Sequence, residues 1–79
     1  MTTKSKIDQV LNIAGLLQPQ SVFLVNKTLQ RFKQGEVVEI VCDKKNSKTI
    51  LANLCPRKKY KIMEQKEMCG FSHLIIMKN

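Results

Sequence analysis

The chain has 79 residues, of which 43% are hydrophobic and 25% are charged, with only three glycines and two prolines. This length allows one small domain with a thin core, and the composition excludes a disordered tail, a collagen-like repeat and a low-complexity linker. Fourteen lysines and arginines outnumber six acidic residues, giving a formal charge of +8, which favours anionic partners such as nucleic acid, phosphorylated cofactors or acidic protein surfaces.

The first half of the chain predicts a strand followed by a helix. Residues 9–13 alternate in polarity, as a short strand does. From residue 19 to residue 33, apolar side chains recur every three or four positions, and Pro19 suits the first turn of a helix. Gly35 provides the left-handed stop. We expect residues 1–8 to form a flexible N-terminal segment.

The second half predicts a strand, a helix and a hairpin. Residues 36–42 are β-branched and apolar, which is typical of a central strand. The polar residues 43–47 can cap a second helix, which ends before Pro56. Residues 60–65 and 71–77 then read as two strands joined at Gly70.

The resulting element order is β-α-β-α-β-β within a single domain that spans residues 1–79. Such an order places two helices on one face of a four-stranded mixed sheet. The predicted fold class is therefore α/β (α+β), a two-layer sandwich.

Residues 11–20 read Leu-Asn-Ile-Ala-Gly-Leu-Leu-Gln-Pro-Gln. They resemble the opening signature of the TusA/SirA-like sulfur carriers, which runs strand, Gly-Leu, one residue, Cys-Pro, one residue, Pro and then the first helix. The resemblance continues through Lys27, the Gly35-Glu36 turn and an apolar strand that ends in Asp43, and it covers residues 11–78. It implies the same two-layer sandwich.

The residue that carries the chemistry of that family is missing here. In the family, a cysteine at the helix N-terminus becomes a thiolate, because free N–H groups and the helix dipole stabilise it, and it accepts a persulfide sulfur. Gln18 occupies that position, and Ser21 replaces the second proline of the motif. An amide cannot carry sulfur, so we expect a non-catalytic binding or adaptor module whose partner is a redox or sulfur-handling protein with an acidic surface.

Two other thiols keep a sulfur-carrier alternative open. Cys55 is followed by Pro56 and three basic residues, which can lower the pKa of its thiol, and Cys69 lies in the predicted hairpin turn. Cys42 ends an apolar strand and reads as a small buried hydrophobe. An incidental role for all three cysteines is the alternative.

The start of the first helix is a candidate anion site, because the first N–H groups of a helix lack intrahelical partners. The phosphate of a nucleotide or of a flavin (FMN or FAD) would dock where the family holds its sulfur, with side-chain donors from Gln18 and Ser21. A solvated helix end is the alternative. The expected site comprises Gln18, Pro19, Gln20, Ser21 and Val22.

A basic run between residues 44 and 61 contains seven of the fourteen basic residues and no acidic one. We expect it to form a surface for an anionic partner, with a solvated charged face as the alternative. Non-specific RNA binding stays open, although Tyr60 is the only aromatic residue in the run and base stacking needs more. The basic residues of the run are Lys44, Lys45, Lys48, Arg57, Lys58, Lys59 and Lys61.

The remaining features point away from metal, membrane and enzyme chemistry. His73 is the only histidine and has no cysteine pair or carboxylate cluster beside it in the sequence, so no metal site is predicted. No apolar run approaches the ~18 residues that a membrane helix needs. No two cysteines have the Cys-x-x-Cys spacing, and reduced thiols are expected. We therefore expect a cytoplasmic monomer without membrane insertion.

Overall fold

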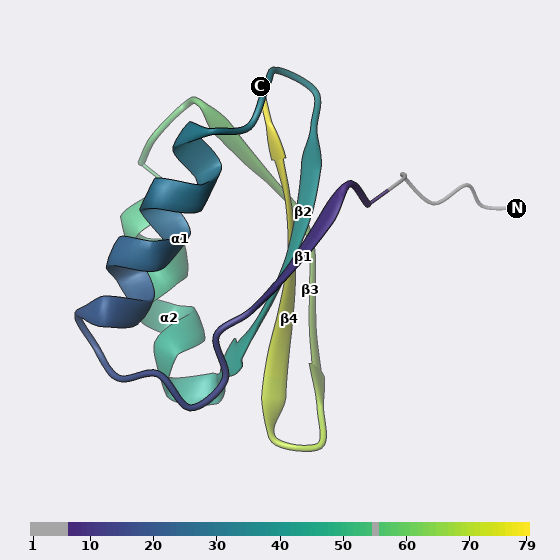
Figure 1. The fold of residues 1–79 in the computed structure, drawn as a ribbon. Helices are drawn as coiled ribbons and strands as arrows, with labels where there is room; N and C mark the ends of the chain where they lie inside the picture. Colours follow the sequence, from purple (N-terminus) through teal and green to yellow (C-terminus); the bar gives the residue numbers. More distant parts are fainter. Residues whose placement is uncertain (1–6, 55) are drawn as a thin grey trace, which may run out of the picture.

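Four strands and two helices follow one another in the order that the sequence predicts (Figure 1). The structure is a computed structural model, and it describes residues 7–54 and 56–79. The elements are β1 (Gln9–Asn12), α1 (Gln20–Gln30), β2 (Val37–Asp43), α2 (Lys44–Leu54), β3 (Tyr60–Met68) and β4 (Phe71–Lys78).

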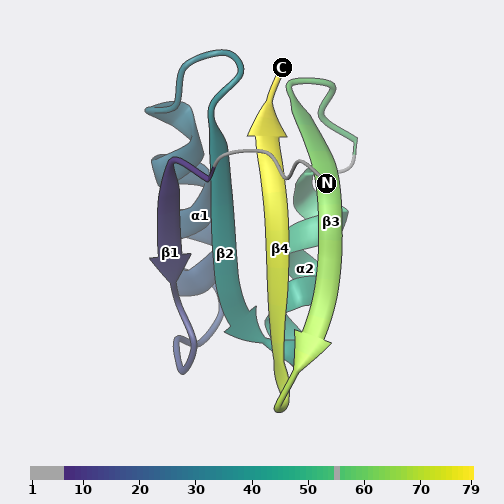
Figure 2. The ribbon, with the colours of Figure 1, turned by 90° about the vertical axis from the view of Figure 1, so that its right-hand side faces the viewer.

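The strands form one mixed sheet in the order β1-β2-β4-β3. β1 runs parallel to β2, whereas β4 is antiparallel to both β2 and β3. Both helices cover the same face of this sheet, and no helix or strand of the described residues covers the opposite face (Figures 1 and 2). The predicted two-layer sandwich is confirmed.

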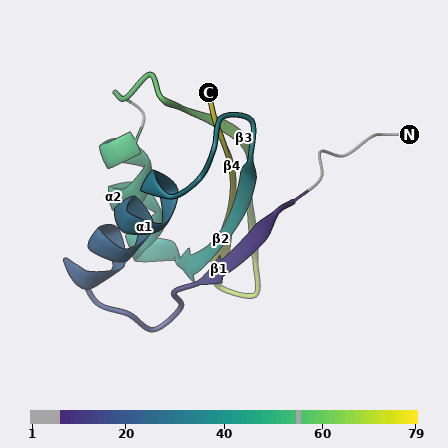
Figure 3. The same ribbon diagram turned by 45° about the horizontal axis from the view of Figure 1, so that its top comes forward.

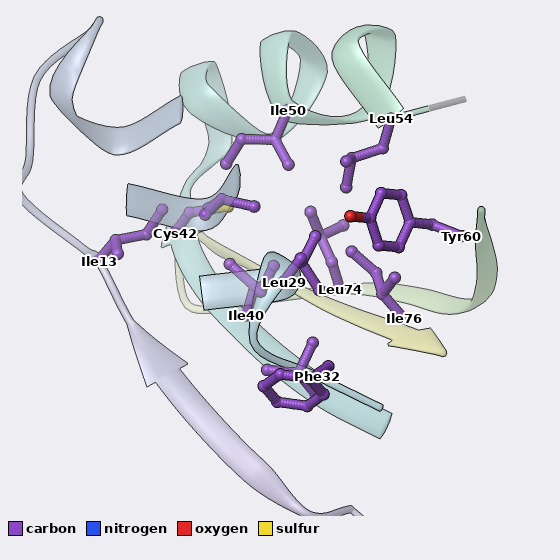
Figure 4. Packing of buried hydrophobic residues seen from close by; sticks show 12 residues of the cluster. Ile13, Leu29, Phe32, Ile40, Cys42, Ile50, Leu54, Tyr60, Leu74 and Ile76 are labelled. Carbon is purple, nitrogen blue, oxygen red and sulfur yellow. The ribbon is translucent and has the colours of Figure 1, made fainter. Parts of the chain in front are cut away.

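The core lies between the sheet and the two helices. Alternate residues of the central strands face the helices, as the two-residue period of a strand requires, and side chains three or four positions apart on each helix meet them (Figure 4). The buried residues at the centre of this layer are Val38, Ile40 and Cys42 of β2, Leu74 and Ile76 of β4, Val25 and Leu29 of α1, and Ile50 and Leu54 of α2.

The first helix ends at Gln30, three residues before the predicted boundary. The next two N–H groups, of Arg31 and Phe32, donate to carbonyls three residues back, so the chain tightens beyond the α-helix. The ammonium group of Lys78 on β4 lies 3.4 Å from the Leu29 carbonyl oxygen and 3.5 Å from that of Gln30. A cation at this position interacts favourably with the carbonyl groups at the negative end of the helix dipole.

The hairpin between β3 and β4 turns at Cys69 and Gly70, where φ is 52° and 83°. Positive φ at both central residues is typical of the two-residue turns that match the twist of a hairpin. Pairing then extends along β3 to Met68, opposite Phe71. β3 is consequently three residues longer than predicted, and the sequence missed this part because Lys66, Glu67 and Met68 show no apolar alternation.

The chain is attached to the sheet from Asp8 onward. The Asp8 N–H donates to the Val37 carbonyl oxygen at 2.8 Å, and the Asp8 carboxylate accepts the Val37 N–H at 2.8 Å. The flexible segment was expected over residues 1–8. Its residues 1–6 lie outside the described residues.

Candidate anion-binding site

The turn before α1 is tied to α2 by two amide side chains. The Gln18 side-chain nitrogen donates to Asn46 Oδ1 at 3.1 Å and to Thr49 Oγ1 at 2.8 Å. Asn46 in turn donates to the Leu16 carbonyl oxygen at 2.8 Å. Gln18 thus uses its donor group within the protein. Its side chain does not serve as the anion donor that the sequence predicted.

The second predicted donor is also turned inward. Ser21 is fully buried on the core-facing side of α1, together with Val25 and Leu29, so its hydroxyl cannot reach a ligand at the surface. The N–H of Ser21 donates to the Leu17 carbonyl oxygen, and that of Phe23 donates to the Pro19 carbonyl oxygen. Both side-chain donors are therefore lost from the expected site over residues 18–22, where Pro19 and Gln20 stay exposed and Val22 packs against the core.

The Gln18 contacts predict a measurable contribution to stability. In Gln18→Ala, two hydrogen bonds are lost and the buried Asn46 loses a partner, so we expect the free energy of unfolding to fall by about 1–2 kcal/mol. Urea denaturation measures this change. Gln20→Ala, at an exposed position two residues further on, is the matched control and should leave stability within about 0.5 kcal/mol. Equal midpoints for the two variants would show that the Gln18 contacts contribute nothing.

The acidic residues are confined to the strands and the positions beside them, whereas basic residues lie on both layers of the molecule. Neither helix contains an acidic residue, and the α2–β3 loop contains none. Each of the six acidic residues lies on a strand or beside one and has a partner within the protein. The contacts are Asp8 with the Val37 N–H, Glu36 with the Lys33 N–H, Glu39 with His73, Asp43 with the Gly15 N–H, Glu64 with Lys66, and Glu67 with Lys44.

The basic run that the sequence predicts as one surface divides in two. α2 has 11 residues and is about 16 Å long, so the basic residues in its first turns are held apart from those that follow its end. Lys61 joins neither group, because it alternates with the core-facing Tyr60 and Ile62 and lies on the sheet face opposite the helices. We call Lys44, Lys45 and Lys48 the start cluster, and Arg57, Lys58 and Lys59 the loop cluster.

The start cluster lies where both helices begin, at the lower end of the molecule in Figure 1. Lys45 borders a hollow of about 340 Å³ between the turn before α1 and the first residues of α2, which Gln18, Asp43 and Asn46 also line. Neither helix has an acidic residue in its first turn, although Asp43 immediately precedes α2 and its carboxylate accepts the Gly15 N–H. Lys44 is 3.7 Å from Glu67, an exposed pair that binds weakly.

The loop cluster lies at the opposite end of α2, beside the end of α1 (Figures 1 and 3). Arg57 donates from Nη1 to Asn26 Oδ1 at 3.3 Å, which connects the loop to α1. Arg57, Lys58 and Lys59 are all exposed. Among the described residues, no carboxylate lies within ion-pair distance of any of them.

The cysteines differ in accessibility. Cys42 is buried, and this burial, with a smaller contribution from the neighbouring Asp43, raises the pKa of its thiol to about 11. It therefore stays protonated at neutral pH and is a packing residue, as predicted. Cys69 is exposed in the hairpin turn. Cys55 lies outside the described residues, and sulfur transfer through Cys55 or Cys69 stays an untested alternative.

Sequence reasoning missed one polar pair on the sheet face opposite the helices. His73 Nδ1 lies 2.8 Å from Glu39 Oε2, and both side chains are about one-fifth exposed. The two residues come from neighbouring strands, β4 and β2. They are not directly opposite each other, because Glu39 pairs with Ile75 and His73 pairs with Val41. The sequence places both on strands, but only the register brings them together. No group of three or more metal-binding side chains is present in residues 7–54 and 56–79.

No protein-family model matches the chain. The similarity to the TusA/SirA-like carriers therefore stays a resemblance in sequence pattern and predicted fold. In the described part of the chain, neither helix has the length and apolar character needed to cross a membrane.

Proposed function

We propose that this chain is a non-catalytic binding module that holds an anionic partner against its helix side. The observation that carries this proposal is the placement of the acidic residues: all six lie on or beside the strands and have partners there, while both helices and the α2–β3 loop carry basic residues and no acidic ones. Cations without carboxylate neighbours attract phosphates and carboxylates from solution. The module acts as a cytoplasmic monomer in this proposal.

The two clusters suit different anions. At the start cluster, Lys45 borders a hollow beside the first residues of α2, and Lys44 and Lys48 lie in the same first turns of that helix. Ammonium groups and the N–H groups at the start of a helix are the usual ligands of a phosphate group. The phosphate of a nucleotide or flavin is therefore the small ligand proposed there. The loop cluster is open and exposed, which fits a carboxylate-rich protein surface better than an enclosed cofactor.

An amide-shift NMR titration of isotope-labelled protein tests the proposal. The ligands are flavin mononucleotide, a dinucleotide, inorganic phosphate, a short RNA and an acidic peptide, each at low and at physiological salt. We expect saturable binding of at least one of them, with an affinity that falls as salt rises, because salt screens exposed charges. If no ligand binds at low salt, the module does not act through its basic surface and the proposal is wrong.

A further inference from the structure

A charged groove runs from the outer side of α1 to the loop cluster. Two adjoining hollows of about 360 and 470 Å³ make it up, and Gln30 and Arg57 line both of them. We call this surface the loop groove; its lining residues are Phe23, Asn26, Lys27, Gln30, Arg57, Lys58, Lys59 and Tyr60.

The loop groove is built for negative charge. Four of its eight lining residues are cationic and none is acidic. The bond from Arg57 to Asn26 uses one guanidinium nitrogen and fixes the side chain against α1, which leaves other N–H donors for a ligand. A guanidinium with free parallel donors binds a carboxylate through two hydrogen bonds.

One end of the groove also offers an apolar contact. Phe23 is 66% exposed and lies off the buried stripe of α1 that Ser21, Val25 and Leu29 form. The core therefore does not account for it. The ammonium group of Lys27 lies 6.0 Å from the centre of its ring. Exposed aromatic and arginine side chains close together are typical of the residues that contribute most to protein–protein binding.

We infer that the loop groove docks a short, extended, acidic segment of a protein partner, with an apolar side chain of that segment on Phe23. This inference rests on the proposed function and names its partner. From Phe23 to Gln30 the helix rises about 10 Å, which three or four residues of an extended peptide span. RNA fits less well, because Tyr60 is only 9% exposed and Phe23 is then the one stacking surface in the groove.

Fluorescence anisotropy with a labelled five-residue peptide, one leucine flanked on each side by two glutamates, tests this inference. We expect Lys58→Glu combined with Lys59→Glu to weaken binding about tenfold or more, since cations at the edge of an interface become repulsive anions. Lys45→Glu combined with Lys48→Glu changes the net charge by the same amount at the other end of α2, and it should weaken binding less than threefold. Phe23→Ala should weaken binding of the leucine peptide and leave the affinity for a peptide with glycine in place of the leucine unchanged.

The possible results separate the groove from the wider proposal. If only Lys45→Glu/Lys48→Glu abolished peptide binding, the inference of a docking site in the loop groove would be wrong. The proposed anion-binding function would stand, with its site at the start cluster. An equal loss of peptide affinity in both double variants would mean that the peptide is attracted non-specifically by the net charge. This result would also contradict docking in the loop groove. Tighter binding of a labelled oligouridine that is lost in Lys58→Glu/Lys59→Glu would assign the groove to RNA. If no probe binds at low salt, the proposed function fails together with the groove.

Discussion

Replacing Ile40 by alanine is expected to lower the free energy of unfolding by about 2–5 kcal/mol. Ile40 is fully buried at the middle of β2, a central strand, where it lies between Leu11 of β1 and Leu74 of β4 in the register. Removing three carbon atoms there loses buried apolar surface and leaves a cavity that two sheet neighbours and the helix layer hold open. A domain of this size has a total stability of about 4–12 kcal/mol, so the variant loses a large share of it.

Thermal and urea denaturation measure this loss. Each kcal/mol shifts the Tm of a domain this small by about 4–8 °C. Val10→Ala is the control, because Val10 is 57% exposed on the edge strand β1 and should cost about 0.5 kcal/mol or less. A similar Tm for Ile40→Ala and Val10→Ala would contradict the packing between the sheet and the helices.

The second large effect is a loss of stability in alkali caused by Cys42. Burial raises the pKa of its thiol from the ordinary value of 9.0 to about 11 in the folded protein. Below pH 9 the thiol is protonated in both states, and the stability linked to it is fully present. Between pH 9 and pH 11 the unfolded chain releases this proton while the folded chain keeps it, so stability falls by about 1.4 kcal/mol per pH unit, or about 3 kcal/mol in all.

Urea denaturation of the wild type and of Cys42→Ala at several pH values from 8 to 11 isolates the contribution of this thiol, because the substitution leaves every other titratable group in place. Cys42→Ala loses some stability at every pH from reduced packing. Its stability should nevertheless fall less steeply with pH than that of the wild type. Parallel curves would mean that the Cys42 thiol has the same pKa in the folded and unfolded chains.

The elements could be predicted from the sequence wherever a periodic pattern exists. Residues 36–42 and 71–77 mark the two central strands to within one residue, because burial imposes strong apolar patterns on them. Boundaries that depend on the backbone or on tertiary contacts were missed. α1 ends three residues before the predicted boundary, in a tightened turn beside the Lys78 ammonium group. α2 begins directly at Lys44, and the Asp43 carboxylate, expected in the polar cap, accepts the Gly15 N–H instead.

The candidate site was less predictable, because the sequence shows which residues are polar but not which of them bond to other parts of the chain or turn into the core. Gln18 and Ser21 have donors of the right chemistry, yet one binds α2 and the other faces the core. The basic run was evident from composition, but its division into two clusters depends on α2 lying within it. Phe23 and Lys27 precede the run by more than fifteen residues, and only the packing of α1 beside the α2–β3 loop brings them to Arg57.

The central claim is that anions bind the helix side of the molecule, and the location of the amide shifts in the NMR titration tests it most directly. The account predicts saturable, salt-sensitive shifts over residues 44–48 with small phosphorylated ligands, and over residues 23–30 and 57–60 with the acidic peptide. Shifts confined to the opposite sheet face, around His73 and Glu39, would contradict it. In that case the basic residues would be a solvated surface, and the Glu39–His73 pair would be the place to look for function.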